Sequence, residues 1–428
     1  MNKILFGVLT ISCIIASVAL AVPPSSDGRI QPSPAHPRYW EFHGKPVMLL
    51  GASVEDNLFQ IPDIETHLDL LQSADGNYVR NTMSWSDEGN VIPYRKLDNG
   101  LFDLEQWNEE FWTRFETLLR ETAERDIIVQ IEVWATFTYY RDLWATKNPF
   151  NPQLNINYTA AESGLSESAD CHPGQTCNPF FRSPPTAEDL PLVRKYQERF
   201  VRKILAHTFQ YSHVLYCMDN ETSVTPAWGA YWAQFILDAA EEAGVQVETT
   251  EMWDAWDLAH AQHANTWKHP ELYSFIEVSQ NNHQTGDAHY NNALAHRQRT
   301  SIPPRPLNNV KIYGAKKKRF GSDCDAVERF WRNLFGGHAS VRFHRPAGGC
   351  GLGLNESAQE NIKSARMFVD TFDIFAAEPA PKRLENRSEN GSFCLAAGEK
   401  EFAVYFPHAG AVTLVLGQST QSVTLQWL

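Results

Sequence analysis

Long apolar runs are scarce in this sequence of 428 residues. The one candidate follows Lys3, covers residues 4–20, and ends in Ala19-Leu20-Ala21, whose small side chains suit a signal peptidase. The residues after it carry none of the positive charge that stops a membrane anchor. We therefore predict a signal peptide over residues 1–21 and a secreted or periplasmic protein with no membrane partner after cleavage. The alternative is an uncleaved anchor.

Positive charge is also scarce, since 37 lysines and arginines stand against 51 acids and give a formal net charge of −14. That balance excludes a nucleic-acid partner. Glycine-rich phosphate loops, a serine nucleophile elbow and zinc-type cysteine spacings are missing as well. The histidines lack the spacing of a metal site on one helix. We therefore expect no cofactor and no metal. The histidines considered are His260, His263, His283 and His289.

Cysteine is sparse, with seven residues in the whole chain. Cleavage of the predicted signal removes Cys13 and leaves an even number, as is common in an oxidising compartment. Cys171 and Cys177 flank a Pro-Gly turn, so we predict a disulfide between them. Cys324 and Cys350 form a second candidate pair.

Apolar runs that end in polar residues alternate with helical patterns along the chain. This alternation predicts parallel strands joined by helices. Eight strands without a dinucleotide loop after the first favour a (β/α)₈ TIM barrel over an open doubly wound sheet. The predicted strands are Pro46–Ala52, Asn77–Met83, Ile127–Val133, His213–Met218, Val245–Glu251, Tyr273–Ser279, Asn309–Tyr313 and Ala339–Phe343.

Two segments depart from this alternation. Residues 144–191 are rich in Asn, Pro and Ser and are predicted to form a lid inserted into a barrel that covers residues 22–378. A linker-like stretch, 377–382, then leads into a small antiparallel β domain over residues 379–428. The strands predicted for it are Phe393–Ala397, Glu401–Phe406, Val412–Leu416 and Val423–Leu428.

Polar and aromatic residues gather at the predicted carboxyl ends of the strands, where barrel enzymes build their sites. Carboxylates, amides and aromatic rings together are what glycoside cleavage requires, and aromatics make up 12 % of the chain. A carbohydrate substrate is therefore predicted. The residues expected to bind it are Asn57, Arg80, Asn81, Glu132, Trp134, Asp219, Asn220, Trp253, Asp254, Gln280, Asn281, His283, Lys311, Tyr313, Arg342 and His344.

Asn220-Glu221, at the end of the fourth predicted strand, resembles the Asn-Glu pair of clan A glycoside hydrolases. The resemblance implies that Glu221 is the general acid/base and that Asn220 contacts a sugar hydroxyl. The opening His43–Gly51, the Arg80-Asn81 strand and the closing β domain resemble the apiosidase-like branch, which often carries a C-terminal collagen-binding-type module. The alternative is that Glu221 forms an ion pair with an arginine at the rim.

One feature departs from the clan A pattern, in which the seventh strand ends in the nucleophilic Glu. Here that strand carries Lys311 and no acid. We hypothesise that Glu277 or Glu251 supplies the second catalytic carboxylate. Glu277 interrupts an apolar run, where a charge is costly unless it is paired or used, and Glu251 precedes Trp253 and Asp254. Alternatively, each acid pairs with Lys311 or Arg80.

Cations also cluster at the predicted site, which is unexpected in an acidic chain. Lys311, Arg342, His344 and Arg345 lie at strand ends, and residues 316–319 read Lys-Lys-Lys-Arg. Guanidinium groups suit carboxylate and sulfate, so an acidic polysaccharide is one hypothesis for the substrate. Otherwise the lysine run is a solvated loop, and the arginines orient Glu221 and its partner.

These observations predict an exported glycoside hydrolase that cleaves a poly- or oligosaccharide by a two-carboxylate mechanism. Three alternatives remain at this point. The chain could be a barrel that binds carbohydrate without catalysis, or a polysaccharide lyase with Lys311 or Tyr313 as its base. It could also be an adhesion protein whose small β domain binds the matrix.

Overall fold

The computed structural model describes residues 28–171, 177–315, 319–346, 348–416 and 423–427. The predicted signal peptide lies outside these ranges. Within them, every helix is too short or too polar to cross a bilayer.

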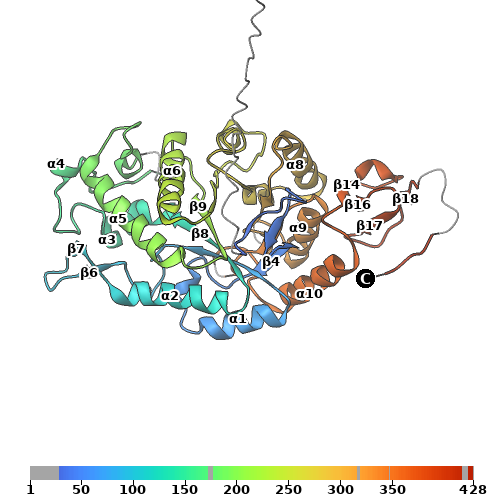
Figure 1. Cartoon of the computed structure of the whole chain (residues 1–428), viewed down its shortest axis with the longest axis horizontal. Helices are drawn as coiled ribbons and strands as arrows, with labels where there is room; N and C mark the ends of the chain where they lie inside the picture. Colours follow the sequence, from blue (N-terminus) through green and yellow to red (C-terminus); the bar gives the residue numbers. More distant parts are fainter. Residues whose placement is uncertain (1–27, 172–176, 316–318, 347, 417–422, 428) are drawn as a thin grey trace, which may run out of the picture.

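A buried parallel sheet forms the centre of the molecule (Figure 1). It has six strands in the order β10-β9-β8-β5-β4-β13. From β4 to β10, neighbours in the sheet are consecutive predicted strands. At the other side, β13, the last predicted strand, pairs with β4, the first. Both faces of these strands are buried, which explains the apolar runs of β4 and β9, whereas β5 and β10 bury polar side chains. The strands are β4 (Leu49–Ala52), β5 (Tyr78–Thr82), β8 (Ile128–Trp134), β9 (Val214–Asp219), β10 (Glu248–Thr250) and β13 (Ser340–Phe343).

A second parallel pair, β11 (Ile276–Glu277) and β12 (Leu307–Asn308), lies between the two ends of this sheet. The strand ladders do not close into a ring. Isolated hydrogen bonds span the gaps, among them Ser274 N to Thr249 O (3.0 Å) and Ala339 N to Leu307 O (2.8 Å). The eight strands therefore follow the order of the prediction, and the α/β class with a parallel sheet is confirmed.

The seventh strand differs from its predicted position, Asn309–Tyr313. The regular pairing stops at Asn308 because side chains take over the next backbone groups. Ser340 Oγ accepts from Asn309 N (2.8 Å), and Ser279 Oγ accepts from Val310 N (2.7 Å). The chain then rejoins β13 through a single bridge at Ile312.

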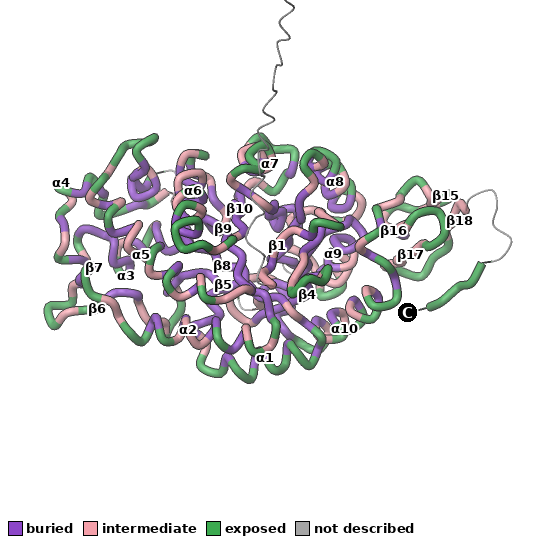
Figure 2. Tube along the Cα trace, viewed as in Figure 1, coloured by how far each residue is buried: buried purple, intermediate pink, exposed green. Residues whose placement is uncertain are grey.

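Amphipathic helices cover the sheet, with buried residues inside and exposed residues outside (Figure 2). In α2, for example, Phe111, Phe115 and Leu118 recur at helical spacing and face the core, and the Asn108 side chain caps the first turn. The helices that alternate with the strands are α1 (Ile64–Ser73), α2 (Glu109–Ala123), α5 (Pro191–Thr208), α6 (Pro226–Ala243), α8 (Gly286–Arg299), α9 (Asp323–Phe335) and α10 (Glu356–Thr371), with the short α7 (Ala264–Trp267) before β11.

A small antiparallel sheet at the amino-terminal side precedes β4. It consists of β1 (Gln31–Pro32), β2 (Trp40–Phe42) and β3 (Lys45–Val47). Trp40 is fully buried and donates its indole N–H to Asn308 Oδ1 at 2.8 Å. This contact ties the sheet to the interior of the strand assembly.

The segment predicted as a lid folds into a packed unit beside α5 and the hairpin of β6 (Tyr94–Lys96) and β7 (Phe102–Trp107) (Figure 1). It contains α3 (Arg141–Lys147) and α4 (Ala160–Ser163). Asn151 donates to two backbone carbonyls, Trp144 O (3.0 Å) and Glu167 O (2.8 Å). The asparagines of this segment therefore replace the regular backbone pairing that it lacks.

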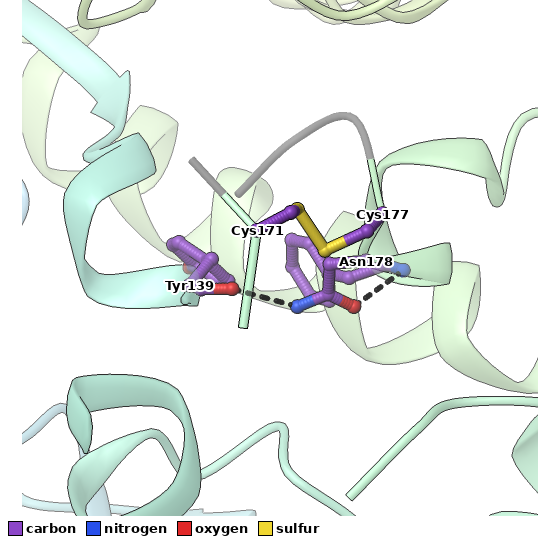
Figure 3. The surroundings of a disulfide bond; sticks show 5 residues. Tyr139, Cys171, Cys177 and Asn178 are labelled. Carbon is purple, nitrogen blue, oxygen red and sulfur yellow. Dashed lines mark hydrogen bonds between the residues drawn. A yellow bond between two sulfur atoms is a disulfide. The ribbon is translucent and has the colours of Figure 1, made fainter. Parts of the chain in front are cut away.

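The predicted disulfide between Cys171 and Cys177 is confirmed (Figure 3). The adjacent Asn178 donates to Tyr139 O (2.8 Å) and anchors the bridge to the segment that follows β8. The second candidate pair is wrong, since Cys324 and Cys350 are free thiols among the described residues. Cys324 is exposed in the first turn of α9, whereas the Cys350 carbonyl is bound to Gly314 N in a separate loop.

The carboxyl-terminal strands form a small antiparallel sheet on α8 and α9 (Figure 1). Phe393 packs on Tyr290, with ring centroids 4.7 Å apart, and Tyr405 packs on Trp331 at 5.6 Å. The predicted linker belongs to this sheet, because β14 lies within it and pairs with β16. The strands are β14 (Glu378–Pro379), β16 (Phe393–Ala397), β17 (Glu401–Tyr405) and the separate pair β15 (Leu384–Glu385) and β18 (Thr413–Leu414). The fourth predicted strand is not formed, since residues 423–427 are exposed and unpaired.

Candidate active site

Glu221 lies just beyond the carboxyl end of β9, in a constrained backbone conformation. Its φ is 54°, in the left-handed region that residues other than glycine rarely adopt. The neighbouring residues hold it there, because Asn220 N binds Trp134 O (3.1 Å) and Thr222 N binds Met252 O (2.8 Å). The Glu221 side chain is 34 % exposed. The tertiary contacts on both sides therefore present this carboxylate to solvent.

Lys311 and Tyr313 converge on the Glu221 carboxylate. Lys311 Nζ lies 2.6 Å from Oε1, and the Tyr313 hydroxyl donates to the same oxygen at 3.2 Å. Partial burial would raise the pKa of Glu221, but the Lys311 ammonium, with help from Gln280 and Arg80, lowers this pKa to about 2. Glu221 is therefore ionised throughout the neutral range.

Arg80 fixes the position of Asn220. Its Nη2 donates to Asn220 Oδ1 at 2.6 Å, and Lys311 Nζ donates to the same oxygen. Arg80 is itself held by both carboxylate oxygens of Glu132, each at 2.5 Å, and by Asp56. Because Arg80 and Lys311 both donate to Asn220 Oδ1, Asn220 can contact a ligand by donating a hydrogen bond from its amide N–H groups.

The positive charges around this opening are balanced by carboxylates. Arg345 Nε lies 2.6 Å from Asp56 Oδ2, and His344 Nδ1 lies 3.6 Å from Asp56 Oδ1. Burial would raise the pKa of Asp56, but Arg80, His344 and Arg345 lower it well below its ordinary value. Arg342 is fully buried in the interior and donates to Val310 O (2.5 Å) and to Ser53. Residues 316–318 of the predicted cationic run lie outside the described residues.

An aromatic wall stands next to Lys311. Tyr313 stacks on Phe320 with centroids 4.4 Å apart, and His283 meets Tyr313 edge-on at 5.4 Å. Burial lowers the pKa of His283 to about 4, so the ring is neutral at pH 7. Trp256 lies beyond His283 at 5.5 Å and is 55 % exposed. Sequence reasoning missed Trp256, because its neighbours in the chain resemble those of the buried Trp253.

Trp134 and Trp253 lie in the core, whereas the sequence suggested that they line a sugar site. Trp134 is fully buried against Trp228 and Trp232. Trp253 is also buried and donates its indole N–H to Thr266 Oγ1 at 2.8 Å. Neither ring has an exposed face on which a sugar could stack.

Glu277 and Glu251 are interior carboxyls. Glu277 is 1 % exposed and accepts from Ser279 N (2.8 Å) and Gln130 Nε2 (3.2 Å). Burial raises its pKa to about 7. Glu251 accepts from the backbone N–H groups of Asp219 (3.1 Å) and Met252 (2.9 Å). Burial and the nearby Asp219 carboxyl raise the pKa of Glu251 well above its ordinary value.

Most of the remaining predicted residues serve structural roles, because their side chains bind the protein itself. Asn81 Oδ1 accepts from Phe59 N (3.0 Å), Asn281 donates to His289 O (2.8 Å), and Asn57 donates to Asn90. Asp254 is half-buried four residues after the end of β10, and its Oδ2 accepts from Ser223 Oγ at 3.5 Å.

The backbone N–H of Asp254 binds the carbonyl oxygen of Thr222 at 2.9 Å, and Thr222 directly follows Glu221 in the chain.

No group of three or more potential metal ligands occurs in the described part of the chain.

Comparisons with known proteins show a likeness of fold. No family model and no curated protein matches the sequence. Among solved structures, the fold is similar to that of family 5 glycoside hydrolases, which are TIM-barrel proteins of clan A.

A family 5 mannosidase from Rhizomucor miehei aligns with a TM-score of 0.54 and 10 % identity over 82 % of this chain and 99 % of its own. A family 5 hydrolase from Bacteroides vulgatus aligns with a TM-score of 0.56 and 11 % identity over 89 % of this chain and 80 % of its own. An endo-1,4-beta-mannanase from Rhizomucor miehei aligns with a TM-score of 0.53, at 11 % identity, over 80 % of this chain and 99 % of its own. The likeness concerns the fold, and at that level the resemblance to clan A is confirmed.

Proposed function

We propose that this protein is an exported glycoside hydrolase that cleaves O-glycosidic bonds in a poly- or oligosaccharide. The observation that carries the proposal is Glu221, an ionised and partly exposed carboxylate at the carboxyl end of the fourth parallel strand. Asn220 and Tyr313 stand beside it with hydrogen-bonding groups of the kind that sugars need. We further propose that the eight strands make the wall of a (β/α)₈ barrel that is related to the apiosidase-like branch.

The charge state of Glu221 bears on its role. A general acid must carry a proton at the working pH. Because Lys311 and Arg80 lower the pKa of Glu221 well below neutrality, its side chain is ionised at pH 7. The proposal therefore assigns Glu221 as the carboxylate that attacks the anomeric carbon or activates water, and not as the resting proton donor that the Asn-Glu resemblance implied.

Asp254 is the partner that we propose for Glu221. Unlike Glu277 and Glu251, it is only half-buried, and it lies four residues after the end of β10. Burial raises the pKa of Tyr140, and the charges of Glu221 and Asp254 raise it further, so both carboxylates act on one half-buried phenol. In this assignment Asp254 is the second carboxyl group that a two-carboxylate mechanism requires, while Glu277 and Glu251 remain buried in the interior.

The contacts around Glu221 favour a neutral sugar there. Lys311 is paired with Glu221, and Arg80 and Arg345 are paired with Asp56. An acidic group on the substrate would have to displace one of these internal carboxylates. Trp256 supplies an exposed ring on which a sugar can stack. The lyase alternative loses support because burial and Glu221 raise the pKa of Tyr313 well above 10, which leaves it protonated and a poor base.

The test is hydrolysis by the Glu221→Gln variant, which removes the charge and keeps the shape of the side chain. We expect the release of reducing ends from a panel of neutral polysaccharides to fall by roughly a thousandfold or more. Glu271→Gln, at an exposed acid near α7, is the matched control and should retain activity. Equal rates for Glu221→Gln and the wild type would refute the assignment. Ultraviolet-absorbing unsaturated products would instead establish elimination.

A further inference from the structure

A basic groove runs along the outer side of α5, away from the residues described above. It has a volume of about 630 Å³ and lies between α5 and the end of β7. Five cations line it in a chain whose formal net charge is −14. They are Arg194, Lys195, Arg199, Arg202 and Lys203.

The helical repeat brings these cations together. Lys195 and Arg199 are four residues apart, Arg199 is three and four residues before Arg202 and Lys203, and Arg194 adjoins Lys195, so the five cations share one face of α5. The opposite face carries Val193, Phe200 and Ile204, which are buried in the core. Because the apolar face of α5 is buried in the core, the basic face points outward into the groove.

Aromatic rings hold two of the cationic groups in place. The Arg199 guanidinium lies over Trp107 at 4.7 Å, and Trp107 in turn stacks on Tyr94 with centroids 5.0 Å apart. Lys203 Nζ lies over Trp112 at 5.5 Å. A cation held over a ring face has less side-chain freedom to lose when it binds a ligand.

Two carboxylates within the groove leave a surplus of positive charge. Glu105 pairs with Lys195 (2.7 Å), and Glu198 lies 3.6 Å from Arg194. Arg202 and Lys203 have no carboxylate within 4.0 Å among the described residues. Arg194 is also paired with Asp189 at 2.5 Å, so five cations stand against three acids, and the excess of positive charge makes this groove attractive to an anion.

We propose that the basic groove is a second carbohydrate site, which binds an acidic polysaccharide through its carboxylate or sulfate groups. Guanidinium groups match the geometry of both anions. Glu105 and Glu198 can accept hydrogen bonds from sugar hydroxyls, and they repel the closely spaced phosphates of a nucleic acid. The groove shares no residue with the Glu221 site, so it serves to hold the enzyme on a charged polymer and not to cleave it.

The experiment measures binding of polygalacturonate and of heparin to the full chain in the Glu221→Gln background, so that cleavage does not interfere. We expect Arg202→Gln/Lys203→Gln to weaken binding roughly tenfold at low salt. The exposed pair Lys363→Gln/Lys400→Gln makes the same change in net charge elsewhere and should leave binding unchanged. The variant Arg202→Lys/Lys203→Arg keeps both positive charges and should also retain binding of the two polymers.

Several outcomes would overturn the proposal. One is that neither polymer binds. Another is that the groove variant and the control variant bind the polymers with equal affinity. A third is that a DNA duplex or anionic lipid vesicles bind as tightly as the acidic polysaccharides. Preference for one of the two acidic polymers would identify carboxylate or sulfate as the recognised group. Because the readout is binding and not turnover, loss of the proposed hydrolase activity would leave this result intact.

Discussion

Lys311→Met tests the electrostatic account of the candidate site most directly. The substitution keeps a long side chain at a buried position and removes the ammonium group 2.6 Å from Glu221. Without that charge, the effect of burial dominates, and the pKa of Glu221 should rise from about 2 towards or above its ordinary value of 4.5. That difference corresponds to about 3 kcal/mol, which solvent screening of a carboxylate that is one-third exposed reduces to about 1 to 2 kcal/mol.

The assay is the pH dependence of kcat/KM. If Glu221 acts as a carboxylate, activity is lost as the pH falls through its pKa. The acid limb of the wild-type profile should therefore lie near the lower end of the accessible range, and the limb of Lys311→Met should lie at least about 1 pH unit higher. Lys363→Met, on the exposed side of α10, is the control.

The lowered pKa of Glu221 also makes the free energy of unfolding depend on pH. Because the pKa of Glu221 is lowered in the folded state, its contribution is present above about pH 4.5 and is lost as the pH falls towards 2. Lys311→Met should remove this acid-side slope in the free energy of unfolding. An unchanged acid limb together with an unchanged slope would show that Lys311 does not set the charge of Glu221.

Two further predictions concern the interior carboxyls. Burial raises the pKa of Glu248 to about 7, so its stabilising contribution is present below about pH 4.5 and is lost as the pH rises through 7. The change in the free energy of unfolding caused by Glu248→Gln should therefore be about 1 to 3 kcal/mol more favourable at pH 8 than at pH 5, because Gln cannot ionise. Equal changes at the two pH values would contradict this. Gly229→Ala should destabilise the protein by about 1 to 3 kcal/mol in urea unfolding, because the new Cβ would lie 2.3 Å from Glu251 Oε2. A higher urea midpoint, as helix propensity alone would give, would show that Glu251 can move away.

Local sequence patterns were sufficient for much of the fold. Central strands such as β4 and β9 are buried on both faces and are mostly apolar, so they appear in the sequence as apolar runs that end in polar residues. The short spacing and the Pro-Gly turn between Cys171 and Cys177 were enough to predict their disulfide. The sequence also located Glu221, because a polar pair directly after a buried strand must lie at the carboxyl edge of the sheet.

Long-range contacts decided what the local pattern left open. The seventh strand is shorter than its apolar run because Ser279 and Ser340, both distant in the chain, take its backbone N–H groups. Trp134 and Trp253 looked like sugar platforms, but their burial depends on helices that are remote in sequence. An exposed tryptophan and a buried one have the same letter and similar neighbours, so only packing separates Trp256 from them.

By itself, the sequence determined the order of strands and helices, the carboxyl edge at which polar residues gather, and the position of Glu221 at that edge. The tertiary structure alone decided the charge of that carboxylate. Lys311 is 90 residues away along the chain and yet lies 2.6 Å from Glu221 in space. A pKa depends on the distances to other charges and on exclusion of water, and both are set only when separate strands pack together.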